Sequence, residues 1–316
     1  MRIPNKIAIG FQEGVCPLKC NKCLIFGRDA KKKKEARKMP FEKAKILIDE
    51  IAGMNPTPGI QPCISGEPFT NSDLRKIITY CNERHVGMSI ITNGILLDEQ
   101  WVDFLVENAS RRCNISFSLD AVTQETYERV RGDYQLERIE EMIEGLLRKR
   151  GSRGPRITVN FTVEEDNESE TAEFIERWKY KADGVRVSVG VDPHKKIPLR
   201  YRHKEHEQMN KKCGFLDGTM VIDSDGHVRS CTYDPFGDTD FGDVFEKGIL
   251  QIWNGEEMRK FRELQSENET CEGNFCQGCE SGMGAMKRNR ISGDFIIREA
   301  DYAIYYNIKT QMQSVD

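Results

Sequence analysis

The sequence has no long hydrophobic run, few cysteines for a secreted scaffold and almost no net charge. No stretch approaches the roughly 18 consecutive apolar residues that a membrane helix needs, and residues 1–11 lack the apolar centre of a signal peptide. The 47 Lys and Arg against 51 Asp and Glu leave a formal charge of −4, which provides no global field for nucleic acid or an anionic membrane. We therefore expect a cytoplasmic protein whose partners include neither nucleic acid nor a membrane.

The 11 cysteines are too few among 316 residues, and odd in number, for a disulfide framework. In a cytoplasmic chain, clustered cysteines indicate a metal site or catalysis. Cys63, Cys81 and Cys113 lie within apolar stretches and are predicted to be core thiols. Most of the others form two groups, one near each end of the chain.

Short apolar, β-branched segments alternate with segments of helical periodicity through most of the chain. The predicted strands cover residues 6–11, 60–65, 88–92, 114–119, 157–163 and 185–191. Helical spacing is clearest over residues 41–51 and 136–146, and Asp98 and Thr123 are predicted N-caps. This alternation predicts an α/β fold of right-handed βαβ units, with chemistry at the carboxyl ends of parallel strands.

The pattern changes near residue 200. Two short apolar segments flank Asp225-Gly226 and predict a β-hairpin, which a helical stretch and a cysteine cluster follow. We expect a barrel domain over residues 1–199, a smaller α+β domain over 200–285 and a tail over 286–316. In the tail, Tyr302, Tyr305 and Tyr306 have helical spacing, which predicts packing rather than a cofactor site.

Cys16, Cys20 and Cys23 form a CxxxCxxC motif directly after the first predicted strand. A helix with three buried cysteines is the alternative, but Gly14 and Pro17 favour a loop. Zinc would need four ligands, and neither a fourth cysteine nor a histidine is close in sequence. Three thiolates leave one iron of a [4Fe–4S] cube open, so we predict a catalytic cluster that binds a small molecule.

The CxxxCxxC motif after the first strand resembles that of the radical S-adenosylmethionine (AdoMet) superfamily, whose members have a partial (βα)6, TIM-like barrel. The resemblance implies that Cys16, Cys20 and Cys23 ligate a [4Fe–4S] cluster whose open iron binds AdoMet. It also implies an external electron donor such as flavodoxin or ferredoxin, and a 5′-deoxyadenosyl radical that abstracts hydrogen. Lys22 departs from the pattern, because the family usually has an aromatic or apolar residue there, near adenine.

The same resemblance extends to AdoMet-binding motifs. Ser65-Gly66-Glu67-Pro68 resembles the family's GGEP motif, which receives the AdoMet ammonium, with Ser65 in place of the first glycine. Asn93 and Ser118 end the third and fourth strands and resemble the wall of the AdoMet site. Ser118 and Arg131 would suit the AdoMet carboxylate. The alternative for Glu67 is an ordinary carboxylate in a strand-to-helix loop.

The second cysteine group resembles an auxiliary-cluster domain. Cys213, Cys231, Cys276 and Cys279 are arranged as in a SPASM domain in its shortened, twitch form, which implies a second [4Fe–4S] cluster. A zinc knot is the alternative. The cysteine spacing is most similar to that of the 2-deoxy-scyllo-inosamine dehydrogenases, aminoglycoside-pathway alcohol oxidases of this superfamily.

Two further residues are candidate catalytic groups. His194 follows the sixth strand and could act as an acid or base toward the substrate. Cys271 lies in a polar stretch, and three roles remain open for it: a surface thiol, a hydrogen donor to a substrate radical, or a replacement cluster ligand.

The predicted function is two-electron oxidation of a polar small molecule, of sugar or cyclitol type, with the auxiliary cluster as electron acceptor. Radical epimerisation and peptide modification are the enzymatic alternatives. A first strand near residue 6 leaves no room for an N-terminal peptide-recognition domain, which favours the small molecule. The non-enzymatic alternatives are a zinc-stabilised binding module and an iron–sulfur electron-transfer module.

Overall fold

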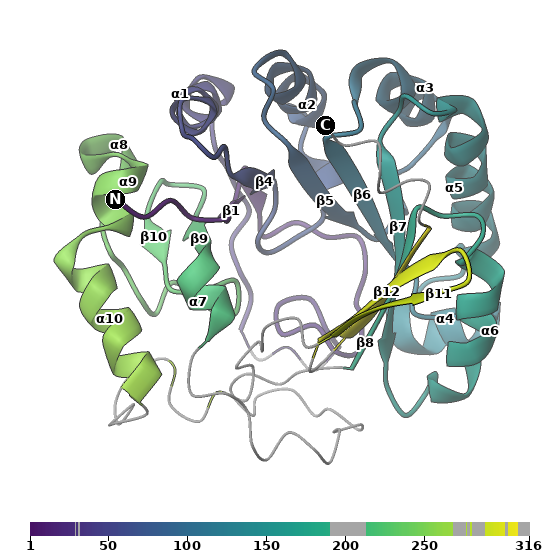
Figure 1. Ribbon diagram of the computed structural model, residues 1–316. Helices are drawn as coiled ribbons and strands as arrows, with labels where there is room; N and C mark the ends of the chain where they lie inside the picture. The colour runs from purple at the N-terminus through teal and green to yellow at the C-terminus, as the bar shows by residue number, and fades with distance from the viewer. Residues whose placement is uncertain are drawn as a thin grey trace.

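The computed structural model describes residues 1–28, 30, 32–189, 213–267, 276, 279, 288–300 and 303–308. An 11-stranded sheet passes through these residues in the order β10-β9-β1-β4-β5-β6-β7-β8-β13-β12-β11. The run from β9 to β8 is parallel throughout, and the sheet curves into an open, partial barrel with its helices on the outside (Figure 1). The predicted α/β partial barrel is therefore confirmed.

All six predicted barrel strands are present. They are β1 (Lys6–Ile9), β4 (Gly59–Gln61), β5 (Met88–Thr92), β6 (Cys113–Ser118), β7 (Arg156–Val163) and β8 (Gly184–Val189). The helices between them are α1 (Phe41–Ala52), α2 (Leu74–Glu83), α3 (Glu99–Asn108), α4 (Gln124–Arg131), α5 (Leu136–Arg150) and α6 (Thr171–Trp178), with short η1 (Pro68–Thr70) and η2 (Glu168–Glu170). β2 (Gln12–Glu13) and β3 (Arg37–Lys38) form a separate two-stranded ribbon.

The hydrophobic core lies between the outer face of the sheet and the helices. In β7, Ile157, Val159 and Phe161 are fully buried in this core, whereas the alternate positions face the interior of the barrel. Asp98 and Thr123 cap α3 and α4 as predicted, each accepting a backbone N–H three residues later. None of the described helices is both long and apolar enough to cross a membrane.

The predicted hairpin around Asp225-Gly226 is confirmed, and it continues the barrel sheet. β9 (Thr219–Ile222) forms an antiparallel pair with β10 (Val228–Arg229). On its other side, β9 forms a parallel pair with β1. The surrounding helices are α7 (Gly214–Gly218), α8 (Val244–Lys247), α9 (Ile249–Trp253) and α10 (Glu256–Glu267). The cysteine-bearing segment after β8 is thereby attached to the first strand of the barrel.

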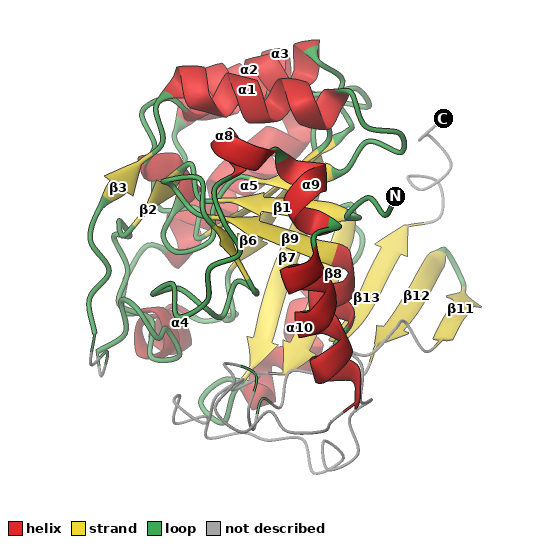
Figure 2. Ribbon diagram, turned by 90° about the vertical axis from the view of Figure 1, so that its left-hand side faces the viewer, coloured by secondary structure: helices red, strands yellow, loops and turns green. Residues whose placement is uncertain are grey.

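Where it is described, the tail forms strands and no helix, so the helical spacing of its tyrosines was misleading. β11 (Arg288–Ser292), β12 (Phe295–Ala300) and β13 (Ala303–Ile308) form an antiparallel meander on β8 (Figure 2). Gly293-Asp294 makes a two-residue turn, with Gly293 at φ +54°. Tyr306 packs against the core as predicted, but Tyr305 lines the barrel interior, and Tyr302 lies outside the described residues.

Candidate functional site

The three cysteines after β1 lie in an irregular loop, as predicted. Gly14 opens it at φ +72°, and a Cβ there would lie 2.0 Å from the carbonyl oxygen of Glu35, so glycine is required. The Gly14 N–H donates to the Ser65 carbonyl at 2.9 Å, and the Glu67 N–H donates to the Val15 carbonyl at 2.8 Å. The cysteine loop and the loop after β4 therefore form one hydrogen-bonded unit.

Each thiol of this loop accepts a hydrogen bond, two of them from residues elsewhere in the barrel and one from within the loop itself. The donors are Asn93 Nδ2 to Cys16 Sγ at 3.7 Å, Arg131 Nη1 to Cys20 Sγ at 3.5 Å and the Phe26 N–H to Cys23 Sγ at 3.3 Å. Donors directed at sulfur favour the thiolate, which is the form that binds iron. The donor set thus fits a cluster held by three thiolates.

Burial, with smaller contributions from the nearby Glu67, Cys20 and Cys23, raises the pKa of Cys16 to about 12, although a backbone hydrogen bond from Leu18 opposes this shift. Such a thiol keeps its proton at neutral pH when no metal is bound. Iron binding at this loop must therefore release protons, as is general for thiolate sites.

Glu67 is 2% exposed and joins the ends of two strands. One carboxylate oxygen accepts the Phe69 N–H at 3.1 Å and the Thr92 hydroxyl at 2.6 Å, and the other accepts the Asn93 N–H at 2.8 Å. Burial raises the pKa of Glu67 to about 7, although these donors oppose the shift. Gly66, at φ +148°, precedes it and packs on the Val15 carbonyl, where a Cβ would lie only 2.7 Å away.

Arg131 and Lys22 share one buried carboxylate, Asp120. Arg131 Nη2 lies 2.7 Å from Asp120 Oδ2, and Lys22 pairs with the same oxygen and with Glu164 at 3.0 Å. Complete burial acts to raise the pKa of Asp120, but the two cations outweigh it and hold the pKa below its ordinary value. The unusual residue before Cys23 is thus explained, because Lys22 is a partner of Asp120.

Ser118 ends β6 beside Asn160 of β7 and is half-buried. The structure therefore brings most of the predicted AdoMet-site residues to the carboxyl ends of β4, β5 and β6. Arg131 arrives at the same end from α4, next to the cysteine loop. His194 and Cys271 lie outside the described residues, so their predicted roles remain untested.

Cys213, Cys231 and Cys279, far apart in sequence, are brought together in the smaller domain. Burial raises the pKa of Cys231 to about 12, with the Tyr233 N–H opposing this and the nearby Cys279 and Cys213 adding to it. The Cys276 carbonyl accepts the Cys279 N–H at 3.1 Å, so a turn links these two cysteines. The core thiols predicted at positions 63, 81 and 113 are buried, at 8%, 0% and 5% exposure.

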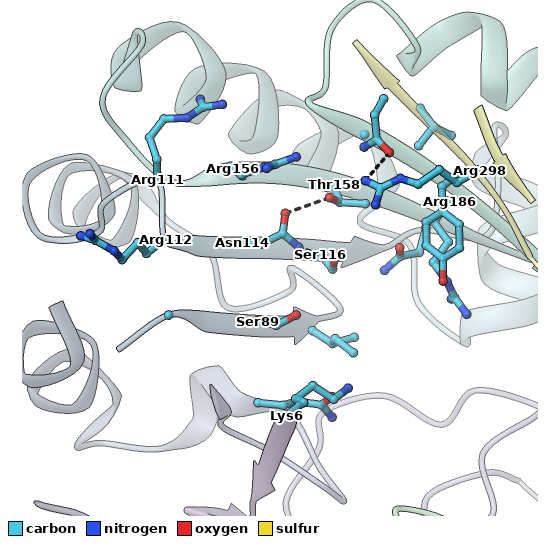
Figure 3. A pocket seen from close by; sticks show the side chains of 18 of the residues that line it. Lys6, Ser89, Arg111, Arg112, Asn114, Ser116, Arg156, Thr158, Arg186 and Arg298 are labelled. Carbon is cyan, nitrogen blue, oxygen red and sulfur yellow. Dashed lines mark hydrogen bonds between the residues drawn. The ribbon is translucent and has the colours of Figure 1, made fainter. Parts of the chain in front are cut away.

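A cavity of about 1090 Å³ occupies the barrel interior (Figure 3). Polar residues at every second position of the central strands face it, among them Asn114 and Ser116 of β6 and Thr158 and Asn160 of β7. The Thr158 hydroxyl donates to Asn114 Oδ1 at 2.9 Å across the two strands. These cavity residues were not predicted from the sequence, although the alternation of polar residues within two β-rich segments was a usable signal.

Residues 14–177, which are 164 of the 316 residues, match the family model described as the radical SAM superfamily. The chain belongs to the radical SAM superfamily. Residues 213–280 match the SPASM iron–sulfur cluster-binding domain. This radical SAM enzyme accordingly binds a [4Fe–4S] cluster and AdoMet. Its SPASM domain provides additional iron–sulfur cluster binding.

Three similar proteins differ in the molecules that their names and titles mention. The radical SAM chain is 27% identical over 324 residues to the AdoMet-dependent heme synthase of Methanosarcina barkeri, covering 85% of this chain and 88% of that enzyme. It shares the fold of BtrN in complex with AdoMet and 2-DOIA, with a TM-score of 0.57 and 17% identity over 88% and 93% of the two chains. It also shares the fold of Streptococcus suis SuiB bound to precursor peptide SuiA, with a TM-score of 0.61 and 17% identity over 82% and 66%.

Proposed function

We propose that this enzyme oxidises a polar small molecule, of sugar or cyclitol type, by two electrons, with the auxiliary cluster accepting one of them. When bound, AdoMet and the two clusters supply a 5′-deoxyadenosyl radical that removes one hydrogen atom, and an acceptor for the remaining electron. One observation carries the proposal: Tyr233 lines the barrel cavity, and its backbone N–H donates to the Cys231 thiol. An acceptor held by Cys231 would therefore lie close to the wall of the cavity.

Different residues of the chain would bind the two clusters and AdoMet. Cys16, Cys20 and Cys23 would ligate the catalytic cluster, and the auxiliary cluster would be held by Cys213, Cys231, Cys276 and Cys279. Glu67, with the Ser65 and Gly66 backbone, would accept hydrogen bonds from the AdoMet amino group beside Asn93. Ser118 and Arg131 would bind the AdoMet carboxylate. In support, Arg131 Nε is buried and has no hydrogen-bond partner among the described residues, so it remains available as a donor.

AdoMet affinity should fall as the pH is lowered through about 7. The Glu67 pKa is raised to about 7, so below that pH the carboxyl gains a proton and loses its capacity to receive the AdoMet amino group. Once Glu67 is protonated, the apparent Kd should rise about tenfold per pH unit. Anaerobic calorimetry of the iron-loaded enzyme between pH 6 and 8.5 measures this.

Glu67→Gln provides the comparison, because it removes the titrating group and leaves the amine of AdoMet unchanged. The variant should bind AdoMet about tenfold or more weakly at pH 8, since a hydrogen bond to a charged group is lost, and its pH profile should be flatter. Glu125→Gln, at an 87% exposed side chain, is the matched control and should behave as the wild type. Equal pH profiles for Glu67→Gln and wild type would contradict the role given to Glu67.

Cys231→Ala tests the proposed oxidation. With dithionite and a panel of sugars and cyclitols that includes 2-deoxy-scyllo-inosamine, wild type should form one oxidised product per substrate-dependent 5′-deoxyadenosine. In Cys231→Ala, iron and Mössbauer analysis should show that the auxiliary cluster is lost. The variant should still cleave AdoMet, but its product yield should fall about tenfold or more. Cys113→Ala, at a core thiol, should keep both clusters. Undiminished oxidation without an auxiliary cluster would refute the proposal.

A peptide substrate is the second candidate, favoured by the shared fold with SuiB, a structure solved with its precursor peptide. Product mass analysis separates the two candidates, because a peptide product retains the precursor's backbone. Epimerisation, with Cys271 as hydrogen donor, would leave the substrate mass unchanged in ordinary water.

In every case we propose an external one-electron donor, such as flavodoxin or ferredoxin, to reduce the catalytic cluster. Membership in an enzyme superfamily leaves the two non-enzymatic alternatives without support.

A further inference from the structure

Glu13 is a buried carboxylate to which neither the cluster sites nor the AdoMet site assigns a role. It ends β2, shortly before Cys16, and is only 2% exposed. One of its oxygens accepts the Ser65 hydroxyl at 3.0 Å and pairs with Lys34 Nζ at 3.0 Å. The other oxygen accepts the Ser224 N–H at 3.0 Å. The buried charge is thus balanced by one cation and by hydrogen-bond donors on both oxygens, as a buried carboxylate requires.

The partners of Glu13 belong to three different parts of the molecule. Ser65 is the first residue of the loop after β4 that we assign to AdoMet. Ser224 follows β9, in the hairpin of the smaller domain. Lys34 lies between the cysteine loop and β3. Glu13 therefore lies where the two loops of the catalytic site meet the auxiliary-cluster domain.

Lys34 extends this contact toward a predicted ligand of the auxiliary cluster. Besides pairing with the buried carboxylate, its ammonium donates to the Pro235 carbonyl. Pro235 follows Asp234, whose N–H donates to the Cys231 carbonyl at 3.1 Å. The Asp234 carboxylate also accepts the N–H and the hydroxyl of Thr239, at 2.8 and 2.6 Å. The loop that Lys34 contacts is therefore held together by its own hydrogen bonds and includes Cys231.

The hairpin provides a second connection to the same cysteine. Asp223, which precedes Ser224, accepts the backbone N–H groups of residues 225–227 at 3.0, 3.1 and 3.0 Å. Its other oxygen accepts Arg229 Nε and Nη2 at 2.9 and 2.6 Å. Arg229 lies on β10, which leads directly to Cys231. A displacement of the turn at Ser224 would therefore also disturb the strand that positions Cys231.

We propose that Glu13 and Lys34 form a positioning pair that joins the AdoMet loop to the auxiliary-cluster domain, so that AdoMet binding and the order of this domain stabilise each other. The effect would reach AdoMet through Ser65, whose hydroxyl is held by Glu13 and whose carbonyl accepts the Gly14 N–H. Coupling of this kind is reciprocal: AdoMet makes the hairpin more rigid, and breaking the pair weakens AdoMet binding. The inference goes beyond the proposed oxidation, because it concerns the enzyme before any substrate is bound.

Amide hydrogen exchange of the iron-loaded enzyme, under anaerobic conditions and without substrate, tests the coupling. In the wild type, saturating AdoMet should slow exchange in residues 219–229 about fivefold or more, which is the lower end of typical couplings between two sites. No residue of this segment is assigned to the AdoMet site. In Lys34→Met this effect on the hairpin should disappear, whereas residues 65–67 should still be protected by bound AdoMet. A purely structural pair would alter hairpin exchange equally with and without AdoMet.

Glu13→Gln and Lys34→Met break the pair from its two sides. The glutamine amide directs an NH2 group at a donor, so one of the hydrogen bonds to position 13 is lost. Both variants should keep the iron content of the wild type, because neither residue is a predicted cluster ligand. Anaerobic calorimetry should show that each raises the AdoMet Kd about fivefold or more. Lys149→Met, which removes an exposed ion pair with Asp103, is the matched control and should change neither the Kd nor the exchange.

The double variant Glu13→Gln/Lys34→Met separates lost coupling from impaired folding, because it leaves no buried charge without a partner. It should bind AdoMet as each single variant does, since both substitutions break the same connection. Additive losses of affinity, or hairpin protection by AdoMet in Lys34→Met equal to that in the wild type, would overturn the proposal. Absence of this protection in the wild type would overturn it as well. Product formation judges the proposed oxidation separately, and failure to oxidise any sugar or cyclitol would not alter these binding and exchange results.

Discussion

Replacing Cys16, Cys20 and Cys23 together with alanine should remove about four irons per chain and abolish 5′-deoxyadenosine formation. The reason is local: the donors that surround these sulfurs, Asn93 Nδ2 and Arg131 Nη1 among them, can stabilise thiolates but cannot themselves ligate iron. The auxiliary cluster should remain, because its predicted ligands lie on other elements. Iron and sulfide analysis, with Mössbauer spectroscopy and product chromatography, measures both effects.

The barrel itself should survive this triple substitution. The loop remains attached through the Gly14–Ser65 and Glu67–Val15 backbone hydrogen bonds, and none of the three side chains belongs to the hydrophobic core cluster. Far-UV circular dichroism should therefore be unchanged. A variant with Cys81 and Cys113 replaced by alanine is the control and should keep all of its iron. Full iron content in the triple variant would refute the ligand assignment.

The barrel strands could be predicted because their outward face repeats a strong local pattern. Ile157, Val159 and Phe161 alternate with polar residues, and such a period-two pattern needs no knowledge of distant segments. The signal for the hairpin at Asp225-Gly226 was equally local, because the two turn residues themselves favour a tight turn. The tail was predicted wrongly for a related reason. The helical spacing of three tyrosines, Tyr302, Tyr305 and Tyr306, is a local pattern too, but Gly293-Asp294 and the β-branched Ile296-Ile297 favour a hairpin.

The candidate site could be predicted only where residues are consecutive or belong to a motif. The cysteine loop and Ser65-Gly66-Glu67 were found in this way. The partner of Lys22 could not be found, because Asp120 lies 98 residues away and only the barrel brings the two together. The lining of the barrel cavity was missed for a similar reason: Lys6, Arg186 and Arg298 are single residues on separate strands, and nothing in the local sequence of each indicates a cavity.

Asp120 combines two constraints that a pair of substitutions can separate. Its backbone has φ +59°, a left-handed conformation that Asp and Asn adopt more readily than other non-glycine residues. Its side chain accepts the Thr162 N–H at 2.6 Å and pairs with Arg131 and Lys22. Asn at this position preserves the backbone and removes only the charge, whereas Ala removes the charge and strains the backbone.

Asp120→Asn should lower the free energy of unfolding by about 3–5 kcal/mol, because it leaves buried Arg131 without its anion. Asp120→Ala should cost more, since backbone strain is added. Asp103→Asn is the matched control: its ion pair with Lys149 has the same 2.7 Å separation as the Arg131 pair but is exposed, so its loss should have little effect. Urea unfolding of the metal-free proteins measures all three. Equal stability of Asp120→Asn and Asp103→Asn would show that the Arg131 charge is compensated elsewhere. With iron bound, loss of the Asp120 charge should also raise the cluster's reduction potential, because uncompensated Arg131 donates to the Cys20 sulfur and favours the reduced, more negative state.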